Sequence, residues 1–455
     1  MAKIKIEKKA TDSLNSLLVK YPQNTRSISG LVRDSKKGLI EGLASVESLD
    51  GWDDPTAEKA QSFWTSIEVM KSLLDSGVCP KNFNSILSII QQKQIALNGL
   101  IGWGYEGIDN HISVYVTGDI IRLYLSLRKF DEIDEIIHTI QIIQNEDGGW
   151  GVCNGDKISK VRSTSCVLSI LLMCVNIEST RKYVDLNTVK KGTNWLFMAQ
   201  NDGDFGWGNL PDTLPSNVSA TSLALNALLE AFKFSLSTSP GNSTIPVRKD
   251  SIIRGLEKLI DMNFKGSWQG VREEFAIYTE NKIIGRHIIG GAGATIVLPV
   301  LLKAIETNLL SWPNDTIYNA IINLSERCKH YSKNGGLWLV PADDGGPSLS
   351  WNSAFALDAF NQIEAFISQW FIDKWIEKPV LDKLLRPLAV WRRISLVFGV
   401  ALIGILLAPY LKSVGDIPSW FLQLNIFYQG LIMMVIALLF EQLYSKVWHA
   451  ISKKI

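Results

Sequence analysis

Two pairs of adjacent carboxylates, each in a turn before a predicted helix, are the residues best placed for acid–base chemistry. The pairs are Asp53 with Asp54, and Asp343 with Asp344 in the segment PADDGGP. Neighbouring carboxylates and hydrogen bonds shift one another's pKa, which is how a protein prepares a proton donor. A structural role is the alternative, because Asp54 before Pro55 is also a typical helix N-cap. We take Asp53 and Asp54 as the candidate catalytic acids and the second pair as a further candidate.

Aromatic residues near the starts of several predicted helices are candidates for ligand binding. They are Trp64, Tyr115, Trp351 and Phe355. Aromatic and small side chains around a concave surface suit an apolar ligand, although core packing is the alternative for each of them. Asp119 and Arg122 lie one helical turn apart, so they either pair with each other or orient a polar head group.

The other residues that carry chemistry form no site that can be read from spacing. Five cysteines and five histidines are scattered without CxxC, HxxxH or HExxH patterns. This predicts no metal, no cofactor and no disulfide framework, and it fits a reducing compartment. Lys and Arg number 46 against 45 Asp and Glu, a net charge of +1, and no basic patch stands out. A nucleic-acid partner is therefore not expected.

A repeated helix pair must position these side chains. In the copy at 187–231, an amphipathic outer helix ends near Gln200, a Gly-Trp turn follows at Trp207, and an apolar inner helix opens near Thr221. Gly and Asp stop the first helix, and the apolar surface of the second predicts its burial. Such turns recur at Trp52, Trp103, Trp150, Trp207, Trp268 and Trp338.

The spacing within the repeats is regular. The spacing from the Trp to the inner-helix opening is 14 residues in four copies and 27 in the fifth. It is 13 in the first copy, where we place the opening at Thr65. The fifth copy therefore holds an insertion, 269–289, which we expect to fold over one mouth of a ring or to be disordered. The predicted outer and inner helices are 30–46 and 55–75, 82–98 and 111–128, 131–144 and 160–176, 186–199 and 216–233, 249–263 and 288–306, and 315–331 and 350–368.

These Gln…Gly-x-Trp turns resemble the QW repeats of squalene–hopene cyclases and other class II terpene cyclases. The helix pairing is also similar to that of prenyltransferase β-subunits. The resemblance covers Gly30 to Phe366, and WLFMAQNDGDFGWG is its most specific piece. It implies an all-α fold, an (α/α)6 toroid over 29–368, with the turn Trp packed between neighbouring units. An open helical solenoid is the alternative, since stacked pairs also bury a core in a superhelix.

The sequence departs from the motifs that give these families their chemistry. Class II cyclases use an Asp in a D-x-D-D-T-A motif, and the nearest string in this chain is DGWDDPTA, which holds Asp53 and Asp54. The D-x-C string with which prenyltransferase β-subunits bind zinc is absent. The resemblance therefore leaves open whether the chain is an enzyme.

The ends of the chain differ in composition from the repeats. Residues 1–28 are expected to form a lead-in helix, 369–392 an amphipathic interfacial linker, 393–445 a hairpin of two transmembrane helices, and 446–455 a basic tail. The uncharged runs 394–411 and 419–440 support the two spans. A hydrophobic hairpin buried in a soluble protein is the alternative. Because Lys and Arg flank the two spans, we expect a multi-pass membrane protein with both termini cytoplasmic.

Three functions remain open from the sequence. The first is a membrane-anchored toroid that binds an apolar or amphipathic, isoprenoid-like ligand or a protein partner without the usual cyclase acid. The second is a divergent terpene-cyclase-like enzyme. The third is a sensor toroid with a two-helix membrane effector, as in some prokaryotic anti-phage systems. The expected partners are the lipid bilayer, an isoprenoid or other apolar ligand, and a second copy of the chain bound through the hairpin.

Overall fold

The computed structural model describes most of the repeat region. The described residues are 28–52, 59–105, 110–237, 245–263, 268, 273–279, 282–289, 293–311, 315–332 and 350–375. The chain divides into two compact units, Met1–Ile367 and Ser368–Ile455. The repeats belong to the first unit.

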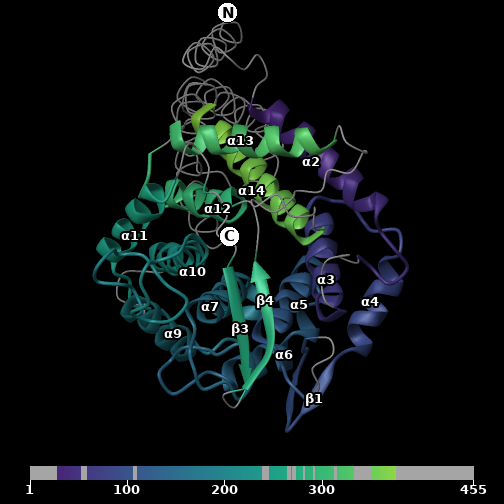
Figure 1. Cartoon of the computed structure of the whole chain (residues 1–455), viewed down its shortest axis with the longest axis vertical. Helices are drawn as coiled ribbons and strands as arrows, with labels where there is room; N and C mark the ends of the chain where they lie inside the picture. The colour runs from purple at the N-terminus through teal and green to yellow at the C-terminus, as the bar shows by residue number, and fades with distance from the viewer. Residues whose placement is uncertain are drawn as a thin grey trace, which may run out of the picture. The chain divides into compact units, whose positions relative to one another are not determined.

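The described part of the first unit contains six helix pairs (Figure 1). The outer helices are α2 (Ile28–Ser45), α4 (Phe83–Gln92), α6 (Asp134–Ile142), α9 (Leu186–Met198), α11 (Lys249–Asp261) and α13 (Asp315–Ser332). The inner helices are α3 (Lys59–Asp75), α5 (Val114–Ser126), α7 (Val161–Asn176), α10 (Val218–Ser237), α12 (Gly293–Glu306) and α14 (Ser350–Trp375). As expected, the inner helices α5, α7 and α10 are buried on nearly every face, because their surfaces are almost wholly apolar or small.

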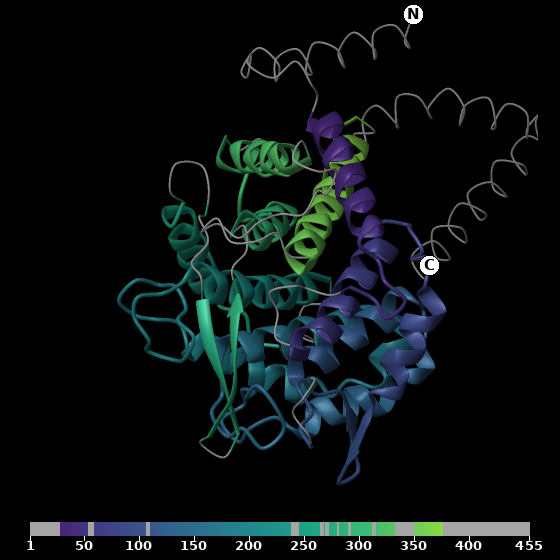
Figure 2. The same ribbon diagram turned by 45° about the vertical axis from the view of Figure 1, so that its right-hand side comes forward.

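The helix pairs close on themselves, as a toroid requires. Inner helices pack in succession, α3 on α5, α5 on α7, α7 on α10 and α10 on α12, and the last outer helix α13 packs on the first, α2. The last inner helix, α14, also meets the first, α3. The ammonium of Lys71 on α3 lies 2.9 Å from the carboxylate of Asp358 on α14. The amide of Asn361 on α14 donates to Ser76 Oγ, just after α3, at 3.0 Å. Figures 1 and 2 both show α14 beside α2 and α3. An open solenoid could not bring together residues separated by 285 positions or more.

The Gly-Trp turns share one set of hydrogen bonds. The backbone N–H of the Trp donates to a hydroxyl 14 residues further on, at 2.9–3.0 Å, in four copies. The pairs are Trp52 with Ser66, Trp103 with Thr117, Trp150 with Thr164, and Trp207 with Thr221. The indole N–H donates to a carbonyl near the end of the outer helix, for example Trp207 to Leu196 at 2.9 Å. The partner in the first copy is Ser66 and not Thr65, so that copy keeps the 14-residue spacing.

The turn Trp also packs against the next unit, as the resemblance implied. Trp150 lies against Gly192 of the following outer helix, where an added Cβ would stand 2.6 Å from the indole. The same contact recurs one unit later at Gly255. The Gln that precedes the turn spans the same junction, because the amide of Gln144 donates to the carbonyl of Thr188 at 3.0 Å.

The fold differs from the all-α expectation in two hairpins. One joins β1 (Ile95–Leu97) to β2 (Leu100–Gly102) through Asn98-Gly99, both with positive φ, the usual two-residue hairpin turn. Outer helix α4 therefore ends at Gln92 and does not reach 98. The second joins β3 (Glu273–Thr279) to β4 (Lys282–Ile289) within the insertion. At the other end, α14 continues to Trp375, into the segment predicted to be a separate linker.

The expected location in a membrane needs correction. Among the described residues, no helix is both long and apolar enough to cross a bilayer. This contradicts the expected protein with two spans and both termini cytoplasmic. The long helices that are described carry charge, such as Glu230 in α10 and Asp358 in α14, and pack their apolar residues within the ring. The runs 394–411 and 419–440, and the lead-in and tail segments, lie outside the described residues.

A candidate acid–base site on the inner helices

One stripe along the inner helices remains partly exposed while the residues around it are buried. On α3 the stripe is Trp64, Glu68 and Lys71, and on α10 it is Leu223, Asn226 and Glu230. Spacings of three and four residues keep side chains on one face of a helix. This face of the ring is therefore accessible, and it is largely polar.

Asp119 is the most firmly held acid on this face. Its side chain is 8 % exposed, and Oδ2 accepts a hydrogen bond of 2.6 Å from the indole N–H of Trp64. The other oxygen pairs with the guanidinium of Arg122 at 3.1 Å. Both carboxylate oxygens of Asp119 therefore have a hydrogen-bond partner, and these contacts fix its orientation.

Glu68 is the acid on this face whose pKa is raised. Burial raises its pKa well above the usual value, and the negative charges of Asp119 and then Asp358 raise it further. Arg122 and Lys71 act in the opposite direction without overcoming these effects. The described part of the chain offers the Glu68 carboxyl no hydrogen bond or ion pair. Glu68 is therefore an acid with a raised pKa and no hydrogen-bond partner among the described residues.

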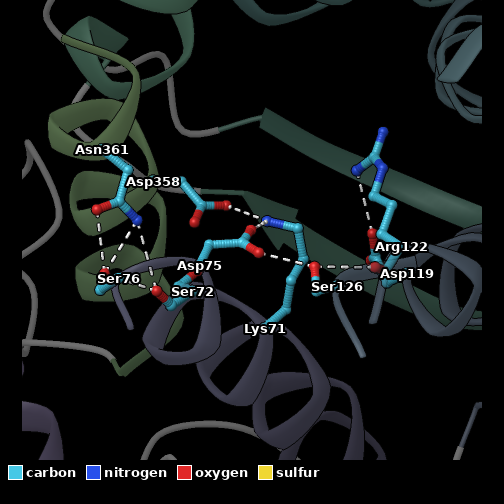
Figure 3. Close-up of polar contacts among 9 residues, drawn as sticks. All are labelled: Lys71, Ser72, Asp75, Ser76, Asp119, Arg122, Ser126, Asp358 and Asn361. Atoms are coloured by element: carbon cyan, nitrogen blue, oxygen red, sulfur yellow. Dashed lines mark hydrogen bonds and ion pairs between the residues drawn. The ribbon is translucent and has the colours of Figure 1, made fainter. Parts of the chain in front are cut away.

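Lys71 is held away from Glu68 by two other acids. Its ammonium lies 2.9 Å from Asp75 on the same helix and 2.9 Å from Asp358 on α14 (Figure 3). Burial by itself would lower the pKa of Lys71, but the two carboxylates outweigh burial and raise it. The lysine stays charged and engaged, so it does not neutralise Glu68.

An aromatic cluster borders the two acids. The ring of Trp64 lies 6.0 Å from Tyr115 at a tilt of 34°, and 6.0 Å from Tyr105 nearly edge-on. The Tyr115 hydroxyl accepts a hydrogen bond of 3.1 Å from Ser163. Trp64 is the member of the cluster that is partly exposed, so its ring can contact a ligand while its N–H orients Asp119.

Cys166 on α7 also faces this cluster, but it is not prepared for catalysis. Burial raises the pKa of the thiol to about 12, and Arg122 lowers it only in part. A nucleophilic cysteine needs a depressed pKa, so Cys166 remains a neutral thiol. Among the described residues, no group of His, Cys, Asp and Glu is placed to hold a metal ion.

The structure brings together four of the residues predicted from sequence: Trp64, Tyr115, Asp119 and Arg122 form one cluster. Phe355 lies one turn before Asp358 on α14 and is partly exposed.

Several predicted residues fall outside what the structure describes. They are Asp53, Asp54, Asp343 and Asp344, together with the side chain of Trp351. Glu68 was missed by the sequence reasoning. Its position four residues after Trp64 and three before Lys71 was the available signal.

Comparison with known proteins establishes the fold and no more. No protein-family model matches the chain, and no curated protein sequence matches it. A family 76 glycoside hydrolase from a bovine Bacteroides thetaiotaomicron strain superposes with a TM-score of 0.51 at 10% identity, over 75% of this chain and 78% of that chain. Another family 76 glycoside hydrolase, a mannosidase from Bacteroides thetaiotaomicron, gives 0.51 at 12% identity, over 74% and 99%.

A type II terpene cyclase from Scytonema gives a TM-score of 0.49 at 11% identity, over 74% of this chain and 99% of that chain. Similarity at such low identity shows shared architecture and not shared chemistry. The chain has the fold of the α/α toroids, without a specific link to squalene–hopene cyclases.

Proposed function

We propose that the inner face of the toroid binds a hydroxyl-rich, saccharide-like ligand and that Glu68 acts on it as a general acid. The observation that carries this proposal is that Glu68, whose pKa is raised, lies on a partly exposed face beside Asp119, which is fixed by Trp64 and Arg122. A carboxyl with a raised pKa next to a second carboxylate is a usual arrangement for acid–base chemistry.

Glu68 and Asp119 have different roles in this proposal. Glu68 gives its proton to an oxygen of the ligand, which weakens the bond from that oxygen to carbon. Asp119, oriented by Trp64 and Arg122, stabilises the positive charge that develops on the carbon side. The cleaved oxygen leaves as an alcohol, water forms the new bond to that carbon, and the proton that the water loses restores Glu68. General-acid catalysis of this kind contributes roughly 10²- to 10⁴-fold in rate.

The raised proton affinity of Glu68 favours an oxygen acceptor over an alkene. A carboxyl with a raised pKa is a weak acid, and it suits an oxygen leaving group better than the far less basic carbon–carbon double bond. Lys71, Arg122 and Asp358 lie near Glu68 and offer hydrogen bonds to hydroxyl groups. The two glycoside hydrolases that share the fold show that a toroid of this kind can host such chemistry.

A second candidate is binding or cyclisation of an isoprenoid-like ligand, as the sequence suggested. The aromatic cluster of Trp64, Tyr105 and Tyr115 favours it, because π-faces stabilise apolar chains and cations. For this candidate the acid would be Asp53 or Asp54.

Calorimetric binding and product analysis separate the two candidates. The purified chain would be titrated with a panel of oligosaccharides and, separately, with squalene and prenyl diphosphates, and products would be identified by mass spectrometry. We expect binding and cleavage of a saccharide that Glu68→Gln abolishes, while Glu257→Gln on the exposed face of α11 leaves both intact. A cyclised isoprenoid product, or saccharide cleavage unaffected by Glu68→Gln, would overturn the proposal.

A further inference from the structure

The accessible face of the ring is built from three layers of side chains. Each of the six inner helices supplies one residue to every layer, at a spacing of three and then four positions. In α3, α5, α7 and α10 the first layer lies two residues after the hydroxyl that accepts from the turn Trp, so these four residues stand at one depth. In α12 and α14 it begins at the first described residue that is partly exposed. Because each inner helix follows the same turn, the first layer lies toward the end of the ring where the inner helices start.

The first layer is divided between acids and apolar residues. Its acids, Glu68 and Asp119, stand on the neighbouring helices α3 and α5. The other four helices supply Cys166, Leu223, Ile296 and Phe355. We refer to Leu223, Ile296 and Phe355, which are partly exposed, as the apolar arc. At this depth the two acids therefore share the ring with an accessible apolar surface.

The second and third layers are polar on nearly every helix. Only Pro299 in the second layer and Met173 in the third lack a charged, hydroxyl or amide side chain. The other residues of these layers are exposed or partly exposed, apart from Ser169, which is buried. The face therefore changes along the axis of the ring, from half apolar where the inner helices start to polar further along them.

Hydrogen bonds join the polar layers between neighbouring helices. Lys71 of α3 lies 2.9 Å from Asp358 of α14 (Figure 3). On the other side of the ring, Asn226 of α10 accepts from Lys303 of α12 at 2.6 Å and donates to Ser169 of α7 at 3.3 Å. These groups include both donors and acceptors, as the hydroxyl groups of a saccharide require.

We propose that the substrate is a saccharide joined through oxygen to an alkyl chain, with the saccharide in the second and third layers and the chain against the apolar arc. This inference rests on the proposed function, since Glu68 is again the acid that cleaves the substrate. Glu68 stands in the first layer, where the polar and apolar parts of the face meet, so the oxygen that it protonates is the one between the two parts of the substrate. The bond from that oxygen to the saccharide carbon breaks, and the oxygen leaves with the proton as an apolar alcohol. Water supplies the hydroxyl on the carbon and returns a proton to Glu68.

The apolar arc favours an alkyl chain over a second sugar ring. Each methylene that leaves water for an apolar surface strengthens binding about fourfold. The hydroxyl groups of a sugar ring at the same place would face Leu223, Ile296 and Phe355, whose side chains offer no hydrogen bond. Polar groups that lose water without gaining a partner weaken binding. An alkyl glycoside should therefore bind more tightly than an oligosaccharide with the same first sugar.

Calorimetric titration of the full chain with methyl, butyl and octyl glycosides of glucose, galactose and mannose, kept below micelle-forming concentrations, tests the proposal. For the sugar that binds, affinity should rise by up to about fourfold per methylene. Leu223→Asn replaces part of the apolar arc by a polar group of similar size, and it should lower the ratio of octyl to methyl affinity about tenfold. Ile296→Thr is a milder change that should lower the same ratio. The matched control is Leu236→Asn, at a position of α10 that is 63 % exposed, which should keep the wild-type ratio.

The chain-length effect decides the inference, and cleavage decides the proposed function. A ratio that rises with chain length and falls in Leu223→Asn but not in Leu236→Asn supports the inference. Equal affinity for methyl and octyl glycosides overturns it, and so does an equal fall of the ratio in both Leu variants. If an oligosaccharide is still cleaved and Glu68→Gln abolishes that cleavage, the proposed function stands without the inference. A chain that neither binds nor cleaves any glycoside or oligosaccharide would remove both.

Discussion

Replacing Thr117 by Val tests whether the hydroxyl 14 residues after the Trp is a structural clamp. The hydroxyl of Thr117 accepts from the N–H of Trp103 at 3.0 Å and donates to its carbonyl at 3.1 Å, and both residues are buried. Val has nearly the same shape, so the change removes hydrogen bonds without opening a cavity. The Trp103 carbonyl keeps a bond from the N–H of Ser113, but the Trp103 N–H is left without an acceptor.

The expected cost follows from that one unpaired group. A buried donor left without a partner costs about 1–3 kcal/mol. Urea unfolding of the full chain, followed by circular dichroism, measures it against Thr213→Val, the same change at an exposed loop residue. The control should stay within about 0.5 kcal/mol of the wild type. If Thr117→Val is as stable as Thr213→Val, the shared hydroxyl is not a clamp and the repeat spacing has another cause.

Three further changes test the packing and the acids. Gly192→Ala should lower the melting temperature, because overpacking against Trp150 costs about 1–3 kcal/mol and the gain in helix propensity is only about 1 kcal/mol. A higher melting temperature would show that the neighbouring side chains move to make room for the added methyl group. Glu68→Gln should be close to the wild type in stability at acid pH and more stable at higher pH, because a raised folded-state pKa gives the wild type stability that is lost as pH rises. A stability difference between the two proteins that does not change with pH would refute the raised pKa of Glu68. Asp119→Asn should move the alkaline limb of the pH–activity profile to lower pH, since it removes a charge that raises the pKa of Glu68; an unmoved limb in an active variant would count against the pairing.

The repeat architecture could be read from the sequence because it is local. The Trp, the hydroxyl opening and the helix-stopping Gly lie within about one unit, so their spacing shows without knowledge of distant contacts. The hairpin turn at Asn98-Gly99 could also have been predicted from the sequence. It was missed because the apolar periodicity of α4 was taken to continue to residue 98. The sequence reading placed the first inner-helix opening at Thr65 and not at Ser66, because both are hydroxyl residues at neighbouring positions.

The candidate site could be read only in part, because its energetics depend on residues far apart in the chain. Trp64, Asp119 and Arg122 were selected from types and spacing, and the structure joins them. Glu68 looked like an ordinary charged helix residue, since nothing near it in sequence shows that it lies, only partly exposed, beside two other carboxylates. Asp358, separated from Lys71 by 287 positions, joins the site only when the ring closes.

The titration of Glu68 in the unmodified chain is the most direct test of the central claim. Carboxyl-labelled glutamate, with Glu68→Gln to assign the resonance, gives its pKa by carbon NMR. A pKa well above the usual value for glutamate is the result we predict. A side chain that ionises at the usual value for glutamate would contradict the proton-donor role and the function built on it.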